Sequence, residues 1–261
     1  MKALEYQSKK WEKVVAHVLA GEKESGADYQ REINVLAEEC AETSDYDRMC
    51  VCITRDYNIL TWEYFVKGNG RKVVETTYLA VKSYFYAYRM KKACVPTKQA
   101  YTNLFSDMED YLCKAIAIDC FDEFIDCYDD TIMGSLYLGK KEEARKQIAQ
   151  LPEVDERRPE VYYIRPRFLK EIYNALLDQE EELLKDELGK RVRKYRKNMI
   201  DYATVIDFTT IGLEKTAKKY GMNVDLNIVE IPNYLKEYIN AQWFQNLKIP
   251  FQDEIEKLLQ L

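Results

Sequence analysis

The chain has 261 residues, of which 47% are hydrophobic and 32% are charged, and its formal net charge is −6. This composition allows a packed core and excludes a chain that is disordered throughout. The negative charge argues against general nucleic-acid binding, because such proteins need a surface that neutralises phosphates.

Turn-forming residues are scarce, with nine glycines and six prolines in the whole chain. Few turns indicate long elements, and apolar residues recurring every three or four positions indicate that these elements are helices. We therefore predict an all-α protein, built as an array of antiparallel helical hairpins in a single unit of residues 1–261. No repeat with a fixed period is visible.

In the first third of the chain the helical spacing is regular. The expected helices cover residues 8–20, 28–42, 45–66 and 72–92, with an irregular middle at 56–58 in the third of these. Gly68-Asn69-Gly70 predicts a tight turn between the last two helices, because glycine accepts positive φ. A further helix is expected over residues 97–110.

The most informative stretch runs from Cys113 to Ile132. At about 100° per residue, Cys113, Cys120 and Cys127 share an apolar face with Phe124. The opposite face carries five carboxylates, which we term the acidic ridge: Asp119, Asp122, Glu123, Asp126 and Asp130. This pattern predicts one amphipathic helix, ending near Gly134, with its charged face in solvent.

The acidic ridge has three readings. It is a solvated face that keeps the protein soluble, or a surface for binding a basic partner. The third reading pairs it with six basic side chains of the same chain, in residues 190–197. The sequence leaves these alternatives open.

Further helices are expected over residues 140–151, 163–177, 180–196, 199–220, 232–244 and 253–259. Asn198 and Gly221 are the expected caps of the helix over 199–220. A short extended segment is expected near 222–229, where apolar and polar residues alternate. Residues 151–159 are charged and contain two prolines, so they mark a boundary between N-terminal helices (1–150) and C-terminal helices (160–261).

The sequence offers no catalytic constellation. His17 is the only histidine, which rules out multi-histidine metal sites and any machinery that needs a second histidine. Asp129-Asp130 lacks the third aspartate of a DDxxD magnesium motif, and no phosphate-binding glycine loop is present. We therefore predict no enzyme activity, no metal and no cofactor.

Seven cysteines are present, and three of them recur at intervals of seven on the helix predicted over Cys113–Ile132. Residues seven apart on one helix lie about 10 Å apart, too far for a disulfide. We therefore predict reduced, mostly buried thiols, as in a cytoplasmic protein. Neither a secretory signal nor a membrane-spanning apolar run is visible.

The C-terminal part resembles the immunity protein 49 family, all-helical proteins of bacterial polymorphic-toxin systems. The matching residues are Arg165-Pro166-Arg167-Phe168-Leu169, Ile206-Asp207, Gly212-Leu213, Ala217, Tyr220-Gly221 and Ile231-Pro232-Asn233-Tyr234-Leu235. A second immunity group, the partners of PoNe-type DNases, has a similar helical and acidic character. It ranks lower because its Trp-Tyr and Gly-Tyr-Trp stretch is missing here.

The resemblance implies an immunity protein that binds and occludes a cognate toxin without catalysis. A basic nuclease-type toxin fits the acidic ridge, since nucleases bind phosphate backbones. The expected partner is thus the toxin, with no nucleic acid and no membrane, and its identity and the oligomeric state stay open. The alternative is a helical-repeat-like scaffold or regulatory module that binds proteins.

Overall fold

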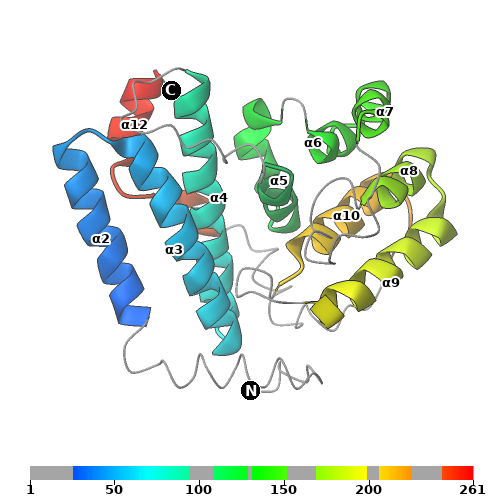
Figure 1. Ribbon diagram of the computed structural model, residues 1–261, viewed down its shortest axis with the longest axis horizontal. Helices are drawn as coiled ribbons and strands as arrows, with labels where there is room; N and C mark the ends of the chain where they lie inside the picture. The colour runs from blue at the N-terminus through cyan, green and yellow to red at the C-terminus, as the bar shows by residue number, and fades with distance from the viewer. Residues whose placement is uncertain are drawn as a thin grey trace. The chain divides into compact units, whose positions relative to one another are not determined.

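The computed structural model describes residues 26–93, 108–128, 131–151, 169–198, 206–224 and 243–260. In this part of the chain every regular element is helical, which confirms the predicted all-α class (Figure 1). The first predicted helix, over 8–20, lies outside the described residues. Of the predicted extended segment, only 222–224 are described, and they are non-helical.

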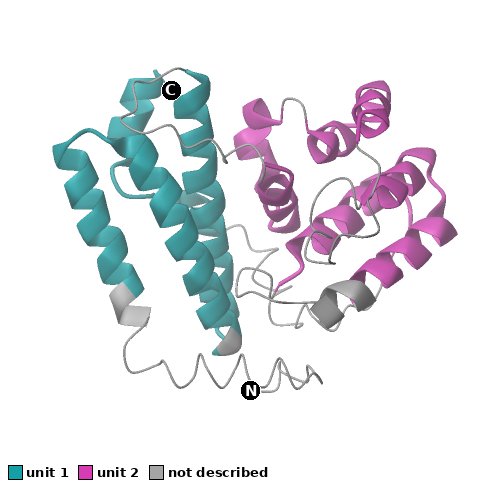
Figure 2. Cartoon of the chain, in the orientation of Figure 1, with its two compact units in different colours: residues 1–104, 230–261 teal, residues 105–229 magenta. Residues whose placement is uncertain are grey.

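The chain forms two compact units, coloured separately in Figure 2. Unit 1 comprises residues 1–104 and 230–261, and unit 2 comprises residues 105–229. This division does not coincide with the boundary predicted at residues 151–159. Helices α7 (Lys141–Ala149) and α8 (Lys170–Asp178) lie on either side of it and pack against each other within unit 2.

The other described helices follow in chain order. Unit 1 contains α2 (Gly26–Glu42), α3 (Tyr46–Val66), α4 (Gly70–Lys92), the short 3₁₀ helix η7 (Trp243–Asn246) and α12 (Gln252–Leu259). Besides α7 and α8, unit 2 contains α5 (Met108–Ala117), the 3₁₀ helix η3 (Phe121–Cys127), α6 (Ile132–Tyr137), α9 (Glu181–Asn198) and α10 (Phe208–Lys219).

Helices α3 and α4 form the centre of unit 1. They are joined by the predicted turn, in which Gly68 has a φ of 72°. The side chain of Asn69 then caps α4 by accepting a hydrogen bond from the amide of Lys72. Contrary to prediction, α3 runs without interruption through residues 56–58, where Asp56 and Tyr57 are buried.

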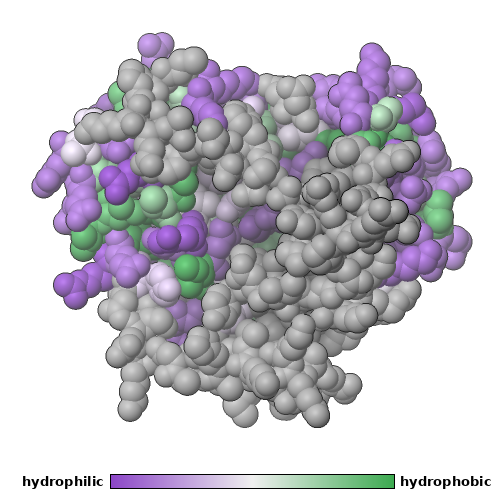
Figure 3. Space-filling model, in the orientation of Figure 1, coloured by the Kyte–Doolittle hydropathy of each residue, from purple (hydrophilic) through white to green (hydrophobic). Residues whose placement is uncertain are grey.

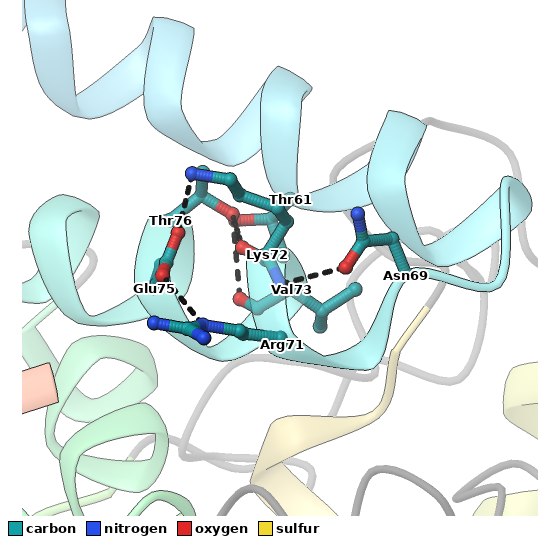
Figure 4. A network of polar contacts seen from close by, with 7 residues as sticks. All are labelled: Thr61, Asn69, Arg71, Lys72, Val73, Glu75 and Thr76. Carbon is teal, nitrogen blue, oxygen red and sulfur yellow. Dashed lines mark hydrogen bonds and ion pairs between the residues drawn. The ribbon is translucent and has the colours of Figure 1, made fainter. Parts of the chain in front are cut away.

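A polar network ties the two helices together near this turn (Figure 4). The hydroxyl of Thr61 on α3 donates to the hydroxyl of Thr76 on α4 over 2.8 Å. Glu75, the residue before Thr76, pairs with Arg71 and Lys72, which lie one turn earlier on α4. Buried hydroxyls cost free energy unless they are hydrogen-bonded, so this pairing fixes how the two helices sit in register.

The C-terminal segment closes unit 1 against α4. The hydroxyl of Tyr78 donates to the carbonyl of Gln245 over 3.1 Å. The buried ammonium group of Lys82 donates to the Tyr78 hydroxyl and to the carbonyl of Leu247, both over 3.0 Å. The ring of Phe244 also packs on Tyr78, with centroids 5.1 Å apart. Residues more than 160 positions apart thus complete one core.

In unit 2 the closest helix packing joins α5 and α10. A Cβ atom on Gly212 would lie 2.8 Å from the backbone carbonyl oxygen of Cys113, so only glycine allows this approach. Helix α10 begins at Phe208, with Asp207 as its cap, and not at Met199 as predicted. Asp207 supplies the cap because its carboxylate accepts the amide of Thr210. Gly221, with a φ of 79°, is at the predicted helix end.

Replacing Tyr78 by phenylalanine removes the hydroxyl that joins α4, Lys82 and the C-terminal segment. We expect the free energy of unfolding to fall by about 1–3 kcal/mol, because a buried ammonium and a carbonyl lose a hydrogen-bond partner. Urea unfolding followed by circular dichroism measures this change.

Tyr57→Phe is the matched control. Tyr57 is also buried, with 4% of its surface exposed against 0% for Tyr78, and its hydroxyl makes no hydrogen bond within the described residues. An equal effect of both substitutions would mean that the hydroxyl of Tyr78 does not stabilise the closure.

Candidate functional site: the acidic segment

The predicted helix over Cys113–Ile132 is wrong beyond Ala117. Helix α5 ends there, and Asp119 adopts the left-handed conformation with a φ of 59°. The amide of Cys120 then bonds back to the carbonyl of Ala115 over 2.9 Å, which terminates the helix. Aspartate is among the few residues that tolerate this conformation, so the sequence permits the break here.

After this break the chain forms the 3₁₀ helix η3. A 3₁₀ helix has three residues per turn, so every third side chain lies on one face. Phe121, Phe124 and Cys127 follow this spacing and are buried. The backbone leaves helical geometry at Phe124, as expected for a 3₁₀ run of this length. Three apolar residues at intervals of three are therefore the physical reason for this conformation.

The outward face of η3 carries three carboxylates of the predicted ridge: Asp122, Glu123 and Asp126. Between them lies Ile125, whose side chain is 45% exposed, whereas Phe121 is only 1% exposed. A helix with 3.6 residues per turn would place Phe121 and Ile125 almost alike, on the flank between the two faces. The 3₁₀ turn separates them, and it places an isoleucine among acidic groups.

We use the name acidic segment for residues 119–128, which hold the described part of the predicted ridge. Asp119 is half-buried and forms an ion pair with Lys215 of α10. Burial lowers the pKa of the Lys215 ammonium, while the pair with Asp119 opposes this shift. Asp130 lies outside the described residues. The structure thus brings three of the five predicted carboxylates together on one exposed face.

Aromatic and basic groups border the acidic segment. The ring of Phe121 packs on that of Tyr137 in α6, with centroids 4.7 Å apart. On the same tyrosine, the ammonium of Lys219 lies 3.9 Å from the ring centroid. Burial, together with Asp122 and Asp119, raises the pKa of Tyr137. The acidic segment is therefore anchored by aromatic packing and edged by lysines of α10.

The described part of the basic run 190–197 pairs elsewhere. Lys190 binds Asp186 and Glu187 within α9, at 2.7 Å each. Arg191 is buried and forms an ion pair with Asp207 over 2.8 Å. The side chains of residues 193–197 lie outside the described set. Lys190 and Arg191 therefore form ion pairs with carboxylates of the chain that lie outside the acidic ridge.

Arg191 belongs to a buried polar network that joins α9 to α10. Its Nε donates to the hydroxyl of Thr210 over 3.1 Å, and that hydroxyl donates to Asp207 over 2.6 Å. Each of these three groups is thereby paired with another group of the network, which is what burial of charge requires. We assign this network to the fold, because its carboxylate and guanidinium bind each other.

A second candidate site is a surface pocket of ≈ 490 Å³ between α2 and α3 in unit 1. Its apolar members are Val35, which is 45% exposed, and Leu36. Figure 3 shows apolar surface over these helices between hydrophilic side chains. The charged lining residues have both signs: Arg31, Glu32, Glu39, Arg55 and Asp56. Such a pocket has no strong preference for the sign of a ligand's charge.

The described cysteines are free, as predicted. Five of them are buried, and Cys52 is half-buried: the buried set is Cys40, Cys50, Cys113, Cys120 and Cys127. Burial raises the pKa of Cys52 and Cys40, so little reactive thiolate forms near neutral pH.

Comparison with known proteins adds no family. No family model, no curated protein and no solved structure matches the chain. The resemblance to the immunity protein 49 family therefore stays a prediction. Within the described residues, no group of three or more histidine, cysteine or acidic side chains could hold a metal ion, and no helix is long and apolar enough to cross a membrane.

Phe121→Ala and Ile125→Ala distinguish the observed 3₁₀ turn from a continuous α-helix. We expect Phe121→Ala to lower the free energy of unfolding by about 3–5 kcal/mol, because it opens a cavity in a packed core. Ile125→Ala should lower it by no more than about 1 kcal/mol, because nearly half of the residue is in solvent. Chemical denaturation of both variants measures the difference, and similar losses would contradict the structure of the acidic segment.

Proposed function

We propose that this protein is an immunity protein, which binds and occludes a basic bacterial toxin through the acidic segment. One observation carries the proposal: Ile125 is exposed between Asp122, Glu123 and Asp126 on a segment anchored by buried aromatic side chains. An apolar contact inside a charged rim is the usual anatomy of a specific protein interface.

The charge of the acidic segment supports a basic partner. Opposite charges across an interface speed association and disfavour wrong partners. Nuclease toxins present basic surfaces because they bind phosphate backbones. An acidic inhibitor can therefore cover the surface by which such a toxin holds nucleic acid, and inhibition requires no chemistry.

The proposal includes a cytoplasmic location, where an immunity protein meets the toxin before the toxin acts. It also includes binding of the toxin without catalysis. The single histidine and the absence of a catalytic motif in the sequence favour binding. The resemblance of the C-terminal part to the immunity protein 49 family favours the same function.

A helical scaffold that binds a regulatory protein is the second candidate. It is favoured by the pocket between α2 and α3, where Val35 and Leu36 lie between charges of both signs. A partner helix with one apolar residue and charged neighbours would fit such a groove. Loss of partner binding on Val35→Asp, with the acidic segment intact, would favour this function.

The toxin proposal is tested with the product of the neighbouring gene, co-purified with this protein. In the double variant Asp122→Lys and Asp126→Lys, we expect association to slow by about tenfold or more at low salt. The effect should shrink towards about 0.15 M salt, where the screening length is about 8 Å. Stability should change by less than about 0.5 kcal/mol, because exposed charges contribute little to folding.

The matched control is the double variant Glu142→Lys and Glu171→Lys. It changes the net charge equally on exposed residues of α7 and α8 in the same unit. Equal slowing by both variants would mean that only the net charge matters. A stable acidic-segment variant that still associates at the native rate and protects cells fully would exclude this surface from the interface.

A further inference from the structure

Helix α6 begins without a cap from its own sequence. Its preceding residue, Thr131, makes no side-chain capping bond to the helix, because its hydroxyl donates to the carbonyl of Tyr128. The first two amides of α6 are bound instead by a carboxylate of another helix. Glu109 of α5 accepts from Ile132 over 2.5 Å and from Met133 over 3.0 Å.

This contact spans the acidic segment. The chain leaves α5 at Ala117, forms the acidic segment and returns at Ile132 to begin α6. Glu109 lies in the first turn of α5 and holds the residue at which the chain returns. Gly134 supports the same closure, because a Cβ atom there would lie 2.6 Å from both Tyr128 and Thr131. The ends of the acidic segment are thus fixed by contacts outside it.

We infer that Glu109 is the positioning residue of the acidic segment, whose carboxyl group holds the return of the chain at α6. The biological role of this contact rests on the proposed function, because the contact would hold the proposed toxin-binding surface in its conformation. The hold itself is a property of the free protein and is tested without a partner.

The sign of the pH dependence follows from burial. Burial raises the pKa of Glu109 from 4.5 to about 7, although the amides of Met133 and Ile132 oppose the shift. When the closure opens, water restores the ordinary pKa, so the closed form binds a proton more tightly than the open form. The closure is therefore firmest below pH 4.5 and weakens as the pH rises through about 7.

The groups around Glu109 do not account for a change between pH 4.5 and about 7. Cys113 on α5 and Tyr173 on α8 interact with it, and burial raises the pKa of both, so they stay neutral. Arg191 of α9 acts on the same two groups, and it is paired with Asp207. Next to Glu109, Asp110 forms an ion pair with Lys114 over 2.9 Å.

The buried thiols of the acidic segment report on its opening. In the experiment N-ethylmaleimide labels the whole protein, and peptide mass spectrometry gives the rates at Cys120 and Cys127. Each rate is divided by the rate in denaturant at the same pH, which removes the intrinsic dependence on thiolate. Cys50, buried in unit 1, is the internal control.

In Glu109→Ala we expect the relative labelling of Cys120 and Cys127 to rise by about tenfold or more, because the amides of Ile132 and Met133 lose their two hydrogen bonds. Labelling of Cys50 should not change. Glu109→Gln keeps an acceptor oxygen and should restore most of the protection. The wild-type protein should label faster from pH 5 to about 7.5 and then level off, whereas Glu109→Gln should show no such rise.

Native protection in Glu109→Ala, or the wild-type pH dependence in Glu109→Gln, would overturn the inference. If Glu109→Ala loosens the whole of unit 2, Cys113 will accelerate together with Cys127, and the pH profile of Glu109→Gln then decides. None of these outcomes depends on the toxin. A failure of the acidic segment to bind a partner would therefore remove the proposed function and leave the labelling result intact.

Discussion

The burial of three side chains at intervals of three residues is the constraint on which the candidate site depends. Phe121, Phe124 and Cys127 face the core of unit 2 together because the backbone of η3 turns about once every three residues. That turn points the intervening residues outward, including Ile125 among the carboxylates. Apolar burial beneath the acidic segment thus fixes its conformation, and the carboxylates above it give its outer face a negative charge.

Ion pairing within the chain follows proximity in space more than proximity in sequence. Lys215 binds Asp119 at the edge of the acidic segment, and Arg191 is buried against Asp207. A buried charge pair fixes geometry more than it adds stability, because desolvation offsets most of the attraction. These pairs therefore position α9 and α10, and the exposed carboxylates of η3 set the electrostatic character of the surface.

The two units reach their cores by different routes. Unit 2 is continuous in sequence, whereas unit 1 is completed by residues 243–260, which bind α4 through Tyr78 and Lys82. Contacts between residues so far apart in the sequence cost loop-closure entropy. No local sequence pattern predicts them. The proline-rich stretch at 151–159 is a good signal for an end of a helix, but it carries no information about which helices pack across it.

The sequence by itself determined the all-α class, because apolar spacing and scarce glycine and proline act locally within each helix. It also determined the turn that contains Gly68 and the helix end at Gly221, which depend on the conformational freedom of single glycines. Only the tertiary structure decided where α5 ends, that Asp119 pairs with Lys215, and that Glu109 supplies the missing cap of α6. Spacing the residues of Cys113–Ile132 at 100° each assumed one continuous helix. The core of unit 2 favoured a turn of three residues instead, and this conformation depends on neighbours that lie far away in the sequence.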